Sequence, residues 1–265
     1  MDSDFIYYEE HEGIGYIFFN RIEKLNALDS QMLRLLNDLL YKIDVSQIKC
    51  LIFKSNSEKA FIAGADVNEM ALFSPDQAYD YSQFGKKVFK LIEDLPIPTI
   101  SLIRGYALGG GCELALSCDF RMCDENAKFG FPEVGLGILP GFGGTVRLPL
   151  LIGPSNAKYL IFSGIIIDSN EALRMNLVNQ VLNSNDFDKK VDIFVKRVIL
   201  NAPISIRSTK NIIKDQDCTQ LFIEESNKFA ACFSTNDCKI GLNAFLKKEK
   251  PVFINEWGDK RWRKR

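Results

Sequence analysis

The chain has 265 residues, which is long enough for one large domain with a substantial buried core. Hydrophobic residues make up 46% of it and charged residues 25%, a balance that excludes an intrinsically disordered chain. Because 33 basic residues stand against 34 acidic ones, the net charge of -1 excludes an overall positive field that would attract nucleic acid or anionic lipid.

Membrane and secretory classes are also disfavoured. The longest run without a charged residue is the 13 residues Val134–Val146, which is too short to span a bilayer and contains a proline and several glycines. The N-terminus is acidic where a signal or transit peptide is basic, so we expect the mature chain to begin at or near Met1. The seven cysteines have no C-x-x-C spacing, which predicts a reduced, cytoplasmic protein.

The single histidine limits the chemistry that the chain can perform. His11 lies in the acidic N-terminal stretch, and zinc sites that need two histidines are therefore excluded. A Ser-His-Asp triad would have to use this one residue and is disfavoured. We therefore expect proton chemistry to depend on carboxylates.

Strands and helices alternate over the first part of the chain. Short apolar runs predict buried strands at 16–19, 48–53 and 99–103. Between the first two strands, apolar residues recur at helical spacing after a cap at Asp29 or Ser30. A further helix is predicted from 75 to 95, so the alternation indicates an α/β fold.

The pattern becomes helical after residue 185. An apolar stripe begins at Phe187, and further helices are predicted over 203–214, 218–233 and 237–248. We therefore expect an α/β core over residues 1–198 and a helical region over residues 199–265, with no flexible linker between them. The basic end, Trp257–Arg265, is interpreted as a solvated tail, with a contact to nucleic acid or to a CoA phosphate as the alternative.

Two glycine-rich segments do not have the spacing of nucleotide loops. Residues 105–111 lack the Lys-Ser/Thr ending of a P-loop, and residues 141–146 lack the final glycine of a dinucleotide fingerprint. These glycines instead indicate a main chain that approaches a ligand closely with its N–H groups available.

The segment 63–70 follows a predicted strand end at 61–62. Asp66 is a good helix N-cap with Glu69 three residues later, a near relative of the capping box. Ala65, just before the cap, would lie in a turn and keep a free main-chain N–H. Taken alone, the segment is more typical of an ordinary strand-to-helix turn.

Two glutamates stand in apolar surroundings. Glu113 follows Gly109–Cys112 at the start of a predicted helix, whose N–H groups and dipole favour a developing negative charge. Glu133 is the only ionisable residue between Lys128 and Arg147. In isolation Glu113 is more typical of a surface residue that stabilises the helix dipole. A carboxyl group in an apolar segment nevertheless indicates an acid or base role.

Three segments taken together resemble the crotonase superfamily, and within it the enoyl-CoA hydratases. They are Ala60–Asp66, Pro98–Ala115 and Phe131–Leu148, and the likeness extends in order from about Asn20 to Phe253. The resemblance implies a crotonase-like spiral of β-β-α turns. It also implies a C-terminal helical region that builds homotrimers, commonly paired as hexamers.

The resemblance further implies a site for acyl-CoA. The oxyanion hole of the family, made of two main-chain N–H groups, is matched by Ala65 and Gly110, and the glutamate pair of its hydratases by Glu113 and Glu133. Contacts with the substrate and its CoA part are matched by Lys24, Leu25, Ala27, Ala63, Asp66 and Lys248. No metal or other cofactor is implied, because coenzyme A is part of the substrate.

The function expected from this resemblance is the hydration of a 2-enoyl-CoA to a 3-hydroxyacyl-CoA, as in fatty acid metabolism. Glu113 would accept a proton from the attacking water and Glu133 would deliver a proton to the α-carbon. The nearest alternative is a Δ3,Δ2-enoyl-CoA isomerase, which needs only the carboxylate at Glu133, so the presence of Glu113 favours hydration. Thioester hydrolysis and decarboxylation are disfavoured by the glutamate pair. A non-catalytic or RNA-binding protein of the same fold is less expected.

Overall fold

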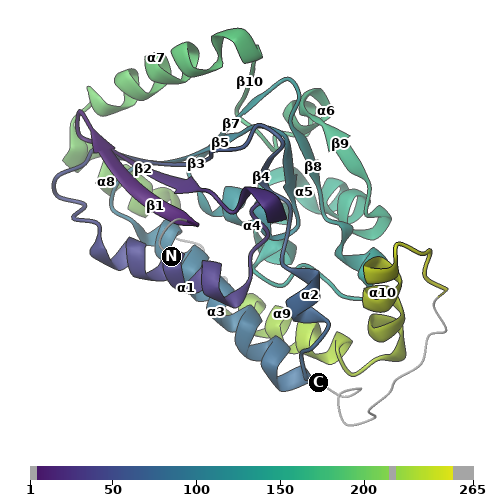
Figure 1. Cartoon of the computed structure of the whole chain (residues 1–265). Helices are drawn as coiled ribbons and strands as arrows, with labels where there is room; N and C mark the ends of the chain where they lie inside the picture. The colour runs from purple at the N-terminus through teal and green to yellow at the C-terminus, as the bar shows by residue number, and fades with distance from the viewer. Residues whose placement is uncertain (1–4, 215–218, 253–265) are drawn as a thin grey trace.

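The computed structural model describes residues 5–214 and 219–252, and within these residues the strands form two sheets (Figure 1). The first sheet has six strands in the order β1 (Ile6–His11), β2 (Ile14–Phe19), β3 (Cys50–Ser55), β5 (Thr99–Ile103), β7 (Phe120–Asp124) and β10 (Gln180–Leu182). The second has four strands in the order β4 (Ala60–Ile62), β6 (Tyr106–Leu108), β8 (Lys128–Gly130) and β9 (Ile166–Asp168).

Successive strands alternate between the two sheets. β3, β5 and β7 belong to the first sheet, and the strand that follows each of them, β4, β6 or β8, belongs to the second. Neighbouring strands run parallel except for the pairs β1 with β2 and β8 with β9, which are antiparallel. Because a helix follows each of these strand pairs, the chain advances by β-β-α turns, and the predicted spiral fold is confirmed.

The helices of the core are α1 (Ser30–Lys42), α2 (Val67–Met70), α3 (Pro75–Asp94), α4 (Gly110–Ser117), α5 (Gly144–Ser163), α6 (Ser169–Arg174) and α7 (Phe187–Ile199). They are followed by α8 (Pro203–Lys214), α9 (Thr219–Cys232) and α10 (Asn236–Lys247). Short 3-10 helices are η2 (Ile22–Lys24), η3 (Pro132–Leu136) and η4 (Ser184–Asp186). The predicted cap of α1 is Asp29, whose side chain accepts a hydrogen bond from the Met32 N–H at 2.7 Å.

Helices cover both faces of the six-stranded sheet because side chains alternate along each strand. In β3, Cys50 and Ile52 pack in the cluster that contains α7, whereas Leu51 and Phe53 pack in the cluster that contains α1 and α3. Figure 1 shows α7 and α1 on opposite sides of this sheet. Burial on both faces explains the continuous apolar run that predicted the strand.

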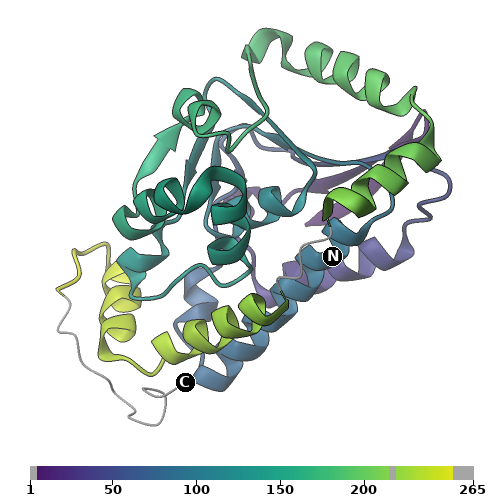
Figure 2. The same cartoon turned by 180° about the vertical axis from the view of Figure 1, so that it is seen from behind.

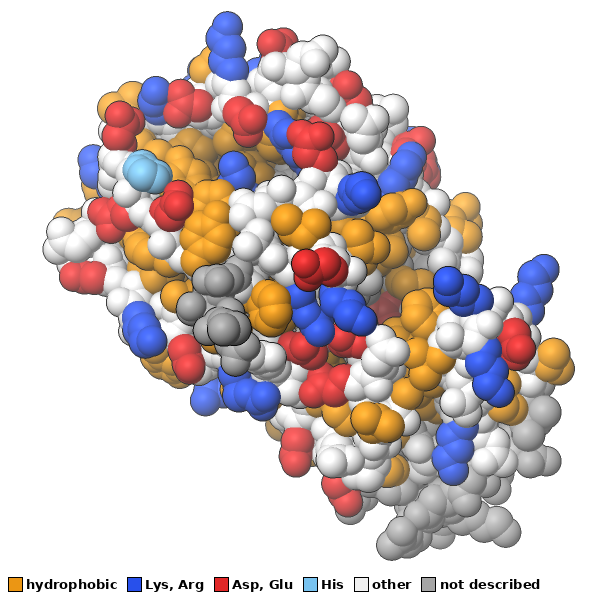
Figure 3. All heavy atoms as spheres, viewed as in Figure 1, with side chains coloured by type: hydrophobic (Ala, Val, Ile, Leu, Met, Phe, Trp, Pro, Cys, Tyr) orange, Lys and Arg blue, Asp and Glu red, His pale blue; other side chains and the backbone are white. Residues whose placement is uncertain are grey.

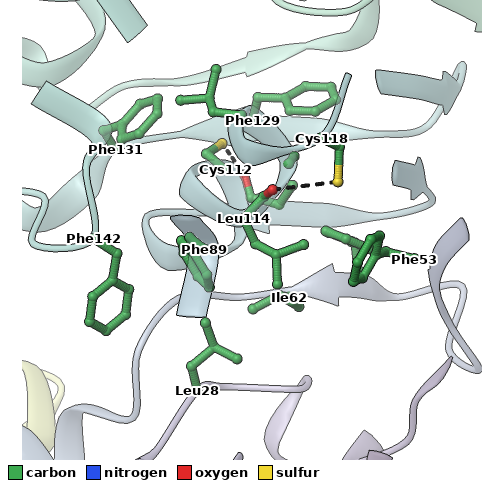
Figure 4. Packing of buried hydrophobic residues seen from close by; sticks show 14 of the residues in the cluster. Leu28, Phe53, Ile62, Phe89, Cys112, Leu114, Cys118, Phe129, Phe131 and Phe142 are labelled. Atoms are coloured by element: carbon green, nitrogen blue, oxygen red, sulfur yellow. Dashed lines mark hydrogen bonds between the residues drawn. The ribbon is translucent and has the colours of Figure 1, made fainter. Parts of the chain in front are cut away.

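Helix α4 is buried along its whole length. Figure 4 shows Leu114 of this helix among Ile62, Phe89 and Phe53, all of which are fully buried. A Cβ added at Gly111 would lie 2.1 Å from the carbonyl oxygen of Ile62, so only glycine permits this approach of α4 to β4. The tight packing fixes the helix that carries Glu113.

The C-terminal helices pack on this core. α9 lies along α3, as Figure 2 shows from behind, and α10 packs against η3 and α2. The boundary expected at residue 198 falls at the end of α7, and the division into residues 1–198 and 199–265 stays a prediction. The predicted tail, Trp257–Arg265, lies outside the described residues.

Charges of both signs are mixed over the surface. Figure 3 shows acidic and basic side chains interspersed on one face, with apolar patches between them. Among the described residues, no helix is both long enough and apolar enough to cross a bilayer.

Candidate active site

A pocket of about 290 Å³ lies where the start of α4 meets η3 and the turn between β4 and α2. Six residues that the sequence analysis singled out line it: Leu25, Ala63, Ala65, Gly110, Glu113 and Glu133. Most of the remaining wall is apolar and includes Met70, Leu108, Phe142, Phe229 and Phe245. Two carboxyl groups therefore share a small and largely apolar space.

The other predicted contact residues lie outside the pocket wall. Lys24 and Lys248 are exposed, and Ala27 is half-buried with its carbonyl accepting a hydrogen bond from Arg21 Nη1 at 2.9 Å. Asp66 is 7% exposed, lies 3.1 Å from Arg21 Nη1, and caps α2 by accepting from the Asn68 N–H at 3.0 Å.

The environment of Asp66 favours its charged form. Burial acts to raise its pKa, but the hydrogen bonds from Asn68 and the charge of Arg21 outweigh burial and hold the pKa below its ordinary value. The capping box suggested by the sequence is not completed, because Glu69 accepts from the Ser30 N–H at 2.8 Å instead. Asp66 and Arg21 thus join the segment before α1 to the turn before α2.

The predicted pair of main-chain donors comes from two different turns. Ala65 lies between β4 and α2, and Gly110 is the first residue of α4. In the described part of the chain, neither N–H donates to a main-chain carbonyl. The first N–H groups of a helix have no partner within it, so Gly110 offers a donor by its position alone.

Gly109 brings the start of α4 against Glu133. Its φ of +45° lies in the left-handed region that favours glycine, and a Cβ there would lie 2.4 Å from Oε1 of Glu133. The glycine run noted in the sequence is therefore needed for the contact between α4 and a carboxyl group.

Glu113 is 1% exposed and is held by two main-chain donors. Its Oε1 accepts from the N–H groups of Phe142 and Gly144, both at 2.7 Å. Burial raises its pKa well above the usual range, and the negative charges of Glu225 and Glu133 add to this, whereas the two donors act in the opposite direction. The donors favour the ionised form of Glu113 and fix the direction of its carboxylate.

Glu133, on η3, is 9% exposed and meets different surroundings. Its Oε2 is buried without a hydrogen-bond partner among the described residues. Burial is the main cause that raises its pKa to about 8, with a smaller contribution from the charge of Glu225. Glu133 is therefore suited to carry a proton at neutral pH.

Residues that the sequence analysis missed stand beside this pair. Tyr81 of α3 lines the pocket and donates to the Leu28 carbonyl at 2.7 Å. Behind the wall, Glu225 of α9 is 4% exposed and lies 3.2 Å from Lys86 Nζ. No signal in the sequence distinguishes them, because a glutamate or lysine in an amphipathic helix is typical of an exposed position.

A larger pocket of about 730 Å³ lies elsewhere, between α8 and the end of α4. Its wall contains none of the predicted site residues. Its charged groups are already paired: Lys210 donates to Asp119 at 2.7 Å, and Glu93 accepts from Arg147 Nε at 2.5 Å. Among the residues that the structure describes, no three His, Cys, Asp or Glu side chains are grouped to bind a metal ion.

Comparison with known proteins identifies related chains over nearly the whole length. Residues 9–256 match the family model of enoyl-CoA hydratase/isomerase. Crotonyl-CoA hydratase of Syntrophomonas wolfei is 39% identical over 97% of this chain and all of its own. Short-chain-enoyl-CoA hydratase of Clostridium acetobutylicum is 39% identical over 94% of this chain and 97% of its own. The solved structure of an enoyl-CoA hydratase from Bacillus anthracis superposes with a TM-score of 0.77 at 34% identity, covering 96% of this chain and all of that one.

Proposed function

This chain belongs to the enoyl-CoA hydratase/isomerase family, and we propose that it hydrates a 2-enoyl-CoA thioester to a 3-hydroxyacyl-CoA, with Glu113 as the base and Glu133 as the acid. The observation that carries this proposal is the pair of buried carboxyl groups on one pocket wall beside the N–H groups of Ala65 and Gly110. Two relatives are named as a crotonyl-CoA hydratase and a short-chain-enoyl-CoA hydratase, which favours a short acyl chain.

The oxyanion hole would bind the thioester carbonyl. When water adds to the β-carbon, negative charge develops on the thioester oxygen, and N–H groups fixed in advance stabilise it. Loss of one such donor typically costs about 3–4 kcal/mol in the transition state. Ala65 and Gly110 line the pocket, and their N–H groups do not donate to a main-chain carbonyl of the described residues. Both observations support their assignment as the two donors of the oxyanion hole.

The two glutamates would divide the proton transfers. Water bound between them loses a proton to the Glu113 carboxylate as its oxygen bonds to the β-carbon, and Glu133 delivers its proton to the α-carbon. Burial raises the pKa of both groups, and the division is supported by the two donors that lower the pKa of Glu113 and by the pKa of about 8 at Glu133. Exchange with solvent then restores both groups.

The CoA part of the substrate would extend away from the pocket. Leu25 and Ala63 line the wall next to the oxyanion turn, and Ala27 and Asp66 lie in the adjoining segments. The exposed side chains of Lys24 and Lys248 are suited to the phosphates of CoA by their charge. We assign these residues to CoA binding, with CoA as part of the substrate and no separate cofactor.

A homotrimer or hexamer is proposed for the assembly. Large apolar side chains are exposed on α5, where Leu150, Tyr159 and Phe162 are 58%, 56% and 72% accessible in the single chain. Contact with further copies would remove this apolar surface from water.

Hydration and isomerisation are separated by one assay. Hydration removes the absorbance of the conjugated thioester when the purified protein meets crotonyl-CoA, and we expect rapid loss with wild type but not with Glu113→Gln. Conversion of a 3-enoyl-CoA to its 2-enoyl isomer without hydration of crotonyl-CoA would instead identify an isomerase and leave Glu113 without a role as base.

A further inference from the structure

The segment 141–145, here called the loop 141–145, leads into α5 and includes its first two residues. It lies between two buried carboxylates and donates alternate N–H groups to them. Phe142 and Gly144 donate to Oε1 of Glu113, both at 2.7 Å. Gly143 and Thr145 donate to Glu225, at 2.7 Å and 3.0 Å. Four successive N–H groups are therefore divided between the proposed base and a residue of the C-terminal helix α9.

Glu225 is itself held firmly. Its side chain is 1% exposed, and Oε1 lies 3.2 Å from Nζ of Lys86 on α3. The hydroxyl group of Thr145 also donates to it. Lys86 donates in addition to the Phe222 carbonyl at 2.6 Å and to the hydroxyl group of Ser226, so α9 is joined to α3 at this point.

The carbonyl groups of the same loop are restrained from other elements. Ser82 donates to the Gly141 carbonyl at 2.6 Å, and Arg147 Nη1 donates to the Phe142 carbonyl at 2.7 Å. Gly143 has a φ of +105°, and a Cβ there would lie 2.0 Å from Arg147 Nη1. Ser82 and Arg147 bind carbonyl groups of the loop, whereas Glu225 binds the N–H groups of Gly143 and Thr145. The N–H groups of Phe142 and Gly144 are then directed at Glu113.

We propose that Glu225 is a positioning residue for the hydration: from α9 it holds the loop 141–145 so that the N–H groups of Phe142 and Gly144 orient the Glu113 carboxylate. The inference rests on the proposed function, because it concerns the base of that reaction. Glu225 does not line the pocket, so it acts on the reaction through the loop and Glu113.

Both charge and hydrogen bonding act on the Glu113 carboxylate. The charged groups that act on Glu113 are Glu225 from α9, Glu133 from η3 and Lys86 from α3, while Arg147 from α5 lies beside the loop and Tyr81 from α3 shares the pocket. The negative charge of Glu225 raises the pKa of Glu113, and the N–H groups of Phe142 and Gly144 lower it, so Glu225 acts on Glu113 both by its charge and through the loop.

The test compares Glu225→Gln with Glu224→Gln, a matched change at the exposed neighbouring position on α9. In Glu225→Gln the NH₂ group of the new amide faces a loop N–H, and two donors cannot form a hydrogen bond with each other. We expect kcat with crotonyl-CoA to fall by about 10- to 100-fold, as small misplacements of a catalytic group do, with KM within about twofold. Loss of the Glu225 charge lowers the pKa of Glu113 and loss of the two donors raises it, so the test depends on kcat and on the contacts of Glu113 and not on the direction in which the acid limb moves. Glu224→Gln should match wild type.

A crystal structure of Glu225→Gln tests the loop without any activity. We expect the two 2.7 Å contacts to Glu113 to lengthen beyond about 3.5 Å. Retention of both contacts, or wild-type kcat, would overturn the proposal. A wild-type protein that does not hydrate crotonyl-CoA would contradict the proposed function instead, and the crystal structure would still decide the role of Glu225 in the loop.

A second variant keeps the test valid if Glu225→Gln does not fold. Glu225→Gln leaves Lys86 buried without its counter-ion, which is strongly destabilising. Lys86→Met combined with Glu225→Gln removes both charges of the ion pair together. The loop N–H groups still lack the carboxylate that accepts them in the wild type. The double variant should show the same lengthened contacts and lower kcat, and wild-type values in it would equally overturn the proposal.

Discussion

Glu113 and Glu133 share a pocket wall but meet different partners. Two main-chain donors hold Oε1 of Glu113, whereas Oε2 of Glu133 has no hydrogen-bond partner among the described residues. Donors stabilise a carboxylate and burial without donors stabilises the protonated acid. Burial raises the pKa of both groups, so the assignment of Glu113 as the base is supported by its two donors and not by its pKa.

Replacing either glutamate by glutamine should lower hydration strongly. Because each would transfer a proton, Glu113→Gln and Glu133→Gln should each reduce kcat with crotonyl-CoA by about 10²–10⁴-fold. Steady-state rates measure this effect, and circular dichroism should show an unchanged fold. Wild-type rates in both variants would contradict the mechanism.

The rate should also fall in alkaline solution. Glu133 can deliver a proton only while protonated, and burial raises its pKa to about 8, so kcat/KM should decline as pH rises through about 8. A pH profile of wild type against the residual activity of Glu133→Gln measures this limb. If the limb persists in Glu133→Gln, it belongs to another group.

The importance of Glu225 could not be predicted from the sequence. Glu224 and Glu225 are adjacent, and only the placement of α9 along α3 buries one and exposes the other. Glu113 and Glu133 were predicted because their neighbours in sequence are apolar. The polar groups around Glu225, by contrast, come from segments more than 75 residues away, such as Thr145 and Lys86.

Among the elements, length did not decide which were predicted: several were predicted closely, as was the end of β4, whereas β1, β7 and the 20-residue helix α5 were not, and neither were β6 and β8. The strand predicted at 99–103 is β5, and the helices predicted at 75–95 and 203–214 are α3 and α8 with ends within one residue. β4, β6 and β8 each have three residues, which is too few to show a period of two. Their assignment to a separate sheet depends on the turns of the spiral, which local sequence does not encode.

Helix α10 meets η3 through two glycines. A Cβ added at Gly241 of α10 would lie 2.5 Å from the carbonyl oxygen of Leu136, and one at Gly137 would lie 2.7 Å from that of Asp237. η3 carries Glu133, and α10 carries Phe245, which lines the pocket. The close contact between α10 and η3 therefore sets the distance between Phe245 and Glu133.

Gly241→Ala should destabilise the protein although alanine favours helices. At an exposed helical site this change gains up to about 1 kcal/mol, but overpacking against Leu136 should cost about 1–3 kcal/mol. We expect a lower melting temperature and a higher KM for crotonyl-CoA, because Phe245 would shift with α10. Asn243→Ala, at an exposed position of the same helix, is the control. A more stable Gly241→Ala variant would show that the contact is not tight.

At the scale of the whole molecule, the pocket combines residues from Leu25 to Phe245. Glycines and isolated carboxyl groups in the sequence indicated the segments around Glu113 and Glu133, whereas the spiral was implied only by the resemblance to the family. It did not indicate Phe229 and Phe245, since apolar residues in amphipathic helices are typical of ordinary core positions. The wall supplied by the C-terminal helices could be found only from the packed structure.

The basic end of the chain should be dispensable for catalysis. The match to the family model ends at residue 256, and the residues from Trp257 to Arg265 carry most of their charge as lysine and arginine. A short terminal run of like charges gains most from hydration, so we expect a chain cut after Asn255 to retain its kcat with crotonyl-CoA and its assembly state. Light scattering coupled to size exclusion and the hydration assay measure these two properties. Both are needed, because a tail that bridges subunits would reduce the measured mass, whereas a tail that binds a CoA phosphate would raise KM and leave the mass unchanged.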